Sequence, residues 1–239
     1  MVFSKRTTNR GGRMGTDTAE HDAKASGGID WLDTGLACCV GLVYFPLKII
    51  EIYYGNPGGL GDSLGNIGSI LCLAYILWRG GRQPEKLREW GLTTPITGAA
   101  LAYFAGFLLL VVISTAGTGL ALVGSLSFEL SYVFRMIDYV SGAFPQQFLV
   151  FAVGVVNMEK FPLLRGQWRL PLLLGTIFCL GHLFMPIHYL WGLPAPVLVT
   201  FPLGFFATWY FLRFRTIIPL VAVHAIGFIL LSNWVDRYL

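Results

Sequence analysis

The chain has 239 residues, of which 55% are hydrophobic and only 13% are charged. Soluble domains carry about a quarter charged residues, so this composition argues against an ordinary soluble globule. The net charge is +4, but the basic residues stand at the ends of apolar runs and form no basic stripe or RNA-binding motif, which excludes a nucleic-acid-binding role. The composition predicts a single helical bundle in a lipid bilayer.

Residues 1–30 are polar, rich in Gly and Thr, and nearly free of large apolar side chains. Such a segment buries too little surface to offset the entropy lost on ordering, so we predict a disordered cytoplasmic tail followed by a transmembrane bundle over 31–239. Seven apolar runs follow the tail, each long enough to cross a hydrocarbon layer of roughly 30 Å. They lie near 31–54, 62–79, 96–118, 137–157, 169–190, 194–213 and 216–234. The predicted fold class is all-α, a polytopic membrane bundle of about seven helices.

The basic residues predict the orientation of this bundle. With the N-terminus in the cytoplasm, 14 of the 17 Lys and Arg residues fall on the cytoplasmic side, and only Lys48, Arg135 and Arg237 fall on the other. Cytoplasmic segments of membrane proteins carry an excess of Lys and Arg. We therefore expect a multi-pass protein with a cytoplasmic N-terminus and a C-terminus on the opposite side.

Between the second and third runs lies the charged segment RQPEKLREWGL. Pro84 can open a short helix, on which Leu87 and Trp90 fall three residues apart on one side. The pattern predicts a short interfacial helix with Trp90 at the level of the lipid headgroups. An ordinary charged loop fits the sequence equally well.

Four cysteines are present, and their positions favour packing roles. Cys38 and Cys39 are adjacent, whereas Cys72 and Cys179 stand alone in apolar runs. Since there is no CxxC pair, the sequence predicts neither a zinc site nor a redox motif. We expect no metal and no cofactor.

Four polar residues interrupt the later apolar runs: Gln146, Gln147, His182 and His224. Polar groups inside a membrane span are costly unless they face a partner or a water-filled cavity. At 1.5 Å per residue, all four lie roughly 12–15 Å below the outer ends of their spans. They could form a shared intramembrane site. They could equally serve as interhelical hydrogen bonds, worth about 0.6–2 kcal/mol each.

The same positions carry a family resemblance. FCLGH supplies Phe178 and His182 in an FxxxH motif, and a later Pro-containing helix supplies His224. Together with the lead-in EKLREWGL, the stretch of roughly 85–235 resembles the CPBP family, which comprises CAAX-prenyl endopeptidases and bacteriocin-processing or bacteriocin-immunity membrane proteins. The family pattern is EExxxR on one helix, FxxxH on the next and HxxxN or HxxxD on a later one.

This chain departs from that pattern at the positions that carry catalysis in the family. Gln146 and Gln147 replace the two glutamates, Phe151 replaces the arginine and Phe228 replaces the final asparagine. In the family, the first glutamate is thought to activate water. An amide has essentially no capacity to accept a proton, so it cannot act as that base. A buried arginine without its carboxylates would be an unpaired charge, which makes the apolar residue at 151 consistent with the loss of both acids.

The sequence therefore favours a non-catalytic member of the fold. It would contact membrane lipids and bind or scaffold a hydrophobic partner, such as a transmembrane helix, a lipidated peptide or a pigment–protein subunit, as a subunit or assembly factor of a membrane complex. The alternative is an intramembrane endopeptidase of the CAAX-protease type, with a rearranged site that acts on lipidated or membrane-anchored peptides. A small transporter fits less well, because the spans show no acidic relay and no internal repeat.

Overall fold

A computed structural model describes residues 28–39, 60–134, 136–182, 189–190 and 193–234. These residues are helical apart from loops and one hairpin of two-residue strands, β1 (Tyr189–Leu190) and β2 (Leu193–Pro194), which confirms the all-α class. An unlabelled N-terminal helix covers 31–39. The labelled helices are α3 (Leu60–Arg82), α4 (Pro84–Glu89), α5 (Gly98–Val123), α6 (Ser131–Phe134), α7 (Met136–Gln147), η2 (Phe148–Val155), α8 (Val156–Met158), η3 (Pro162–Leu164), α9 (Arg169–His182), α10 (Ala195–Phe214) and α11 (Ile218–Trp234).

Most of the predicted runs coincide with these helices to within a few residues. The first run is described only over 31–39, and 40–54 lie outside the described residues. Of the fifth run, α9 covers Arg169–His182, residues 183–188 lie outside the described residues, and Tyr189–Leu190 form β1 instead of the predicted helix. Within the described residues, two helical stretches, Gly98–Val123 and Tyr139–Met158, have the length and apolar composition needed to cross a membrane.

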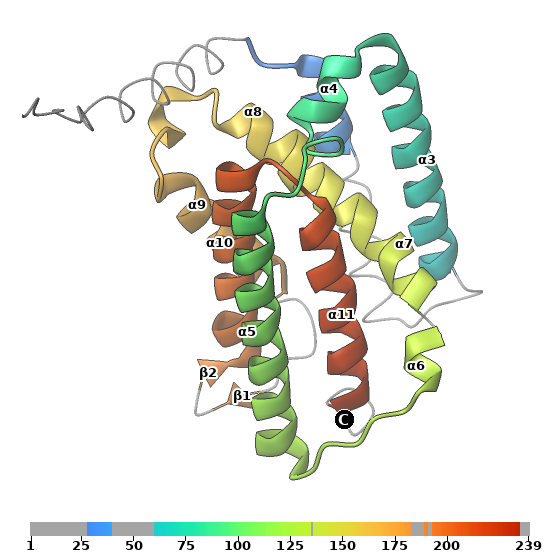
Figure 1. Ribbon diagram of the computed structural model, residues 1–239, viewed down its shortest axis with the longest axis vertical. Helices are drawn as coiled ribbons and strands as arrows, with labels where there is room; N and C mark the ends of the chain where they lie inside the picture. Colours follow the sequence, from blue (N-terminus) through green and yellow to red (C-terminus); the bar gives the residue numbers. More distant parts are fainter. Residues whose placement is uncertain (1–27, 40–59, 135, 183–188, 191–192, 235–239) are drawn as a thin grey trace, which may run out of the picture.

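The long helices form a bundle along the long axis of the molecule (Figure 1). Helix α11 packs against both α5 and α7, α9 packs against α10, and α3 packs against α7. Helix α4 and the N-terminal helix lie at one end of this bundle, and α6 and the β1–β2 hairpin lie at the other (Figure 1). We call the first of these the α4 end.

Two glycines allow α9 and α10 to approach closely. A Cβ atom added at Gly204 would lie 2.8 Å from the Cβ of Phe178 and 3.2 Å from the Cα of Gly175. A Cβ added at Gly175 would lie 3.0 Å from the backbone oxygen of Phe201. Small residues at a helix crossing let backbones come together in this way, a common arrangement between helices in membranes.

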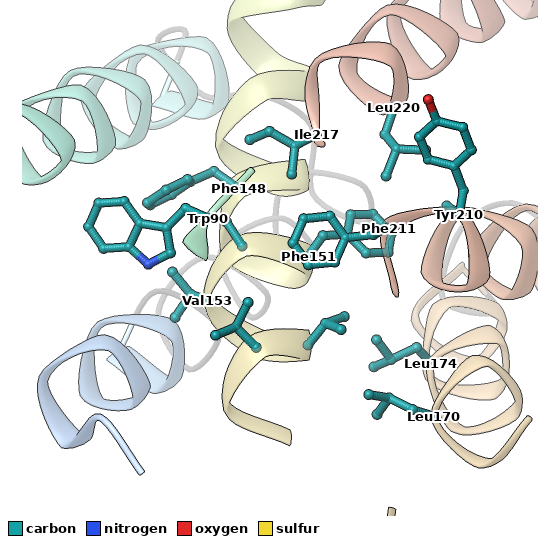
Figure 2. Packing of buried hydrophobic residues seen from close by; sticks show 14 of the residues in the cluster. Trp90, Phe148, Phe151, Val153, Leu170, Leu174, Tyr210, Phe211, Ile217 and Leu220 are labelled. Atoms are coloured by element: carbon teal, nitrogen blue, oxygen red, sulfur yellow. The ribbon is translucent and has the colours of Figure 1, made fainter. Parts of the chain in front are cut away.

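The main core lies near the α4 end and combines several aromatic rings with a larger number of aliphatic side chains (Figure 2). Trp90, Phe148, Phe151 and Phe211 are all almost completely buried there. The Trp90 ring meets that of Phe148 edge-on at 5.2 Å between centroids. The segment before α5 does contain the predicted short helix, α4. Trp90 is completely buried in the protein, so its ring does not face lipid headgroups. Its indole N–H instead donates to the buried carboxylate of Asp33.

Candidate functional site

The candidate site begins at a proline that interrupts a hydrogen-bond ladder. Pro145 lies inside α7 and has no N–H, so the carbonyl of Ser141 loses its normal partner four residues on. The hydroxyl of Ser69, on α3, donates to that carbonyl at 2.6 Å. Directly after α7, the helix widens into the π-helical stretch η2. Such stretches are rare and frequently occur at functional sites.

Gln147 closes α7 and meets the third-motif histidine. Its side-chain nitrogen lies 2.6 Å from Nδ1 of His224, on α11. An amide N–H only donates, so Nδ1 accepts and a neutral His224 carries its proton on Nε2. The ring of Phe178, on α9, approaches His224 edge-on at 6.5 Å. The structure thus brings together one predicted amide, one predicted histidine and the phenylalanine of the FxxxH motif.

The other predicted site positions are arranged differently. Gln146 is half-buried, whereas Gln147 is buried. Phe151 is 2% exposed and packs against the ring of Phe211, so it is part of the hydrophobic core. His182 is the last residue of α9 and Phe228 lies within α11. The side chains of these last two lie outside the described residues.

We expect Gln147→Leu to lower the free energy of unfolding by about 0.6–2 kcal/mol, the usual worth of an interhelical hydrogen bond in a membrane protein. Leucine is one atom shorter but fills a similar volume, and it removes the donor to His224. Thermal unfolding of the purified protein in detergent measures the effect. The matched control is Gln146→Leu, one residue earlier and half-buried, which should unfold close to wild type. Equal losses in the two variants would mean that the pair with His224 contributes nothing specific.

A second polar cluster lies at the α4 end and joins three segments. Asp30 accepts hydrogen bonds from the backbone N–H groups of residues 32 and 33, as a helix N-cap does. The same carboxylate pairs at 2.8 Å with Arg79, at the end of α3, and at 2.8 Å with Lys86, on α4. Lys86 also contacts Asp33 at 3.2 Å and Glu89 at 2.9 Å. We call these five side chains the ion cluster.

Asp33 is the most deeply buried member of the ion cluster, with no exposed surface. It accepts hydrogen bonds from the Tyr75 hydroxyl, from Lys86 and from the Trp90 indole. Buried charges are stable only when paired and hydrogen-bonded, and these donors meet that requirement. The ion pairs and hydrogen bonds of Asp30 and Asp33 therefore hold the first turn of the N-terminal helix against α3 and α4.

Burial and hydrogen bonding shift the pKa values of Asp30 and Lys86 in opposite directions. Burial alone would raise the pKa of Asp30, but hydrogen bonds from Lys86, the Asp33 backbone N–H and Arg79 outweigh it and hold the pKa well below its usual range. Burial alone would lower the pKa of Lys86, but hydrogen bonds to Asp30 and Glu89 outweigh it and hold the pKa above its usual range.

The direction of each pKa shift gives the pH range over which Asp30 and Lys86 stabilise the folded protein. The stability that Asp30 contributes is present above its unfolded pKa of about 3.9 and is lost only as the pH falls below that value. The contribution of Lys86 is complete below its unfolded pKa of about 10.4 and is lost only as the pH rises beyond it. Asp30 and Lys86 therefore stay charged at every physiological pH, so the ion pair between them stabilises the fold and does not act as a pH switch.

A further ion pair lies at the same end. Arg215, in the turn between α10 and α11, contacts both carboxylate oxygens of Glu159 at 2.8 and 2.6 Å. The guanidinium also lies 5.7 Å from the centre of the Phe211 ring. In the same turn, the N–H of Ile217 donates to the carbonyl of Gly91 at 3.2 Å. These contacts tie the α10–α11 turn to α8 and to the segment after α4.

Sequence reasoning missed the ion cluster. The spacing of Asp30 and Asp33, three residues apart before an apolar run, is the one local signal, because it places both carboxylates on one side of a first helical turn. Their partners Arg79 and Lys86 are about fifty residues away in the chain, so nothing in the sequence pairs them. A comparison of the chain with models of protein families, with curated proteins and with solved structures gives no match. The function is therefore inferred from the chain's own residues.

Proposed function

We propose that this protein is a non-catalytic, multi-pass membrane bundle with a CPBP-like core, which acts by binding a hydrophobic or transmembrane protein partner. The observation that carries this proposal is the environment of α5. This helix is long and strongly apolar, yet only 17% of its most apolar window is buried inside the molecule. The core helix of a soluble protein would be covered by its own chain.

The exposed side chains of α5 are large and hydrophobic along its whole length. Leu101, Leu109, Ile113 and Leu120 are each more than half exposed. Helix α3 adds Ile70, Leu71, Leu73 and Leu77, which are exposed to a similar degree. Soluble monomers rarely expose such continuous apolar surface. Lipid tails and an apolar partner together would shield this surface from water.

The placement of charge supports the orientation in this proposal. Every ion pair found among the described residues joins side chains near the α4 end of the bundle. The N-terminal helix lies at this end, and α11 ends at Trp234 toward the other (Figure 1). With the basic residues on the cytoplasmic side, the α4 end faces the cytoplasm and the C-terminus lies across the membrane.

The chemistry of the Gln147–His224 pair supports a binding role. Both groups are uncharged in the observed arrangement, and the amide cannot take a proton from water. Phe151 fills with a buried ring the space that a catalytic arginine would need. A neutral polar pair suits a hydrogen bond to a peptide group of a partner helix, and it costs less to keep within lipid than carboxylates do.

Affinity purification in a mild detergent, followed by mass spectrometry, tests the proposal. We expect a membrane protein in stoichiometric amount, retained with only modest change in Gln146→Ala and His182→Ala variants and reduced in His224→Ala, which removes one member of the neutral pair. The pure protein should leave prenylated and membrane-anchored peptides uncut. Cleavage of such a peptide by wild type, lost in His224→Ala, would overturn the proposal in favour of the endopeptidase.

A further inference from the structure

A half-open groove of about 330 Å³ lies between α5 and α10. Tyr103, Gly106 and Phe107 line it from α5, and Phe206 and Trp209 line it from α10. Trp168, which precedes α9, completes the lining. Small-molecule pockets in proteins begin at about this volume and are mostly apolar, as this one is.

The walls of the groove are held in place by contacts among their own residues. The rings of Tyr103 and Trp209 meet edge-on across the two helices at 5.2 Å. Trp168 stacks on Phe205 at 6.0 Å. The buried hydroxyl of Tyr210 donates to the carbonyl of Ala100 at 3.2 Å and so joins α10 to α5. The groove is therefore preformed, and a ligand does not have to bear the cost of ordering it.

Arginines lie close in the chain to residues that line the groove toward the α4 end. Arg213 is exposed and follows Trp209 by four residues on α10, which places both on one face of the helix. Arg165 and Arg169 flank Trp168 in the chain, and Arg169 donates to the backbone carbonyl of Leu163 at 3.1 Å. The apolar groove suits the apolar tail of a ligand, and the nearby arginines suit its anionic head.

We propose that this groove binds an anionic phospholipid, with one acyl chain between α5 and α10 and the phosphate near Arg213. From Tyr103 to Leu110 the groove follows α5 for seven residues, or roughly 10 Å, which accommodates the upper half of an acyl chain. Exposed Trp and Tyr rings next to arginine are typical of the headgroup level of membrane proteins. This inference rests on the proposed membrane location.

Native mass spectrometry of the purified full chain tests the inference. The protein is exchanged into detergent containing phosphatidylglycerol or phosphatidylcholine with identical acyl chains. We expect one retained phosphatidylglycerol, bound about fivefold more tightly than phosphatidylcholine for each arginine that contacts it. Arg213→Gln should reduce that preference by about fivefold.

Gly106→Leu places a side chain in the groove, and its Cβ meets nothing within 4 Å. We expect this variant to lose the bound lipid while it unfolds at the wild-type temperature. The matched control is Gly117→Leu, eleven residues on along the same face of α5 and equally free of contacts, which should keep the lipid. Equal retention of both lipids by wild type, retention by Gly106→Leu, or a protein subunit in place of the lipid would each overturn the inference. Because the purified chain would still require detergent in those cases, the proposed membrane location would stand.

Discussion

Replacement of Lys86 by methionine is expected to lower the free energy of unfolding by about 3–5 kcal/mol, the usual cost of removing one partner from a buried ion pair. Lys86 lies within 3.2 Å of the carboxylates of Asp30, Asp33 and Glu89. Methionine fills a similar volume but leaves these acids facing one another with only Arg79 and Lys160 nearby. Thermal unfolding in detergent measures the loss of stability.

The same variant should release the N-terminal helix before the rest of the bundle unfolds. Residues 31–39 are fastened through Asp30 and Asp33, so protease should cut this segment faster in Lys86→Met than in wild type. Arg88→Met is the matched control, because Arg88 lies two residues away on the same short helix, is exposed, and loses the same charge. Similar unfolding of the two variants would show that net charge, and not the buried pairing, explains the effect.

Replacement of Gly204 by isoleucine is the second substitution with a large expected effect. The added Cβ would lie 2.8 Å from the Cβ of Phe178 and 3.2 Å from the Cα of Gly175, so α9 and α10 have to separate. Insertion of extra atoms into a close contact costs about 1–3 kcal/mol, and backbone atoms yield less readily than side chains. The unfolding temperature and the rate of proteolysis of the α9–α10 unit both report this loss.

Gly117→Ile is the control for this substitution, since a Cβ there meets nothing within 4 Å. It makes the same chemical change in the exposed part of α5. We expect it to unfold at or slightly above the wild-type temperature, because glycine is a poor helix former. A loss equal to that of Gly204→Ile would mean that the α9–α10 crossing is not specially close.

The helices were predictable from the sequence because a long apolar run within a membrane satisfies its backbone hydrogen bonds by forming a helix. The runs over 96–118 and 216–234 correspond closely to α5 and α11. Trp90 was misplaced because a short charged helix with one tryptophan looks the same whether it lies on a membrane or folds back onto the core. Asp33, which accepts the indole N–H of Trp90 inside the protein, lies in a distant segment of the chain.

The candidate site was predicted in part, and for a geometric reason. Equal depth in the predicted spans suggested that a glutamine of the fourth run and His224 could meet, and Gln147 does meet it. Sequence depth cannot choose between Gln146 and Gln147, because neighbouring residues point about 100° apart on a helix and only the packing of α11 selects one. The hydrogen bond from Ser69 to the carbonyl of Ser141 could not be predicted either, since it depends on where α3 lies.

The lipid exposure of α5 is the central claim, and a cysteine at Ile113 tests it most directly. In the purified chain, with native cysteines replaced by alanine and the protein reconstituted alone in lipid nanodiscs, a water-soluble maleimide reaches both membrane faces. Ile113→Cys, more than half exposed in the structure, should react far more slowly than Thr93→Cys in the segment before α5, and equally fast after denaturation in SDS. Equal rates in the native nanodisc would show that water, not lipid, surrounds α5 and would contradict the account.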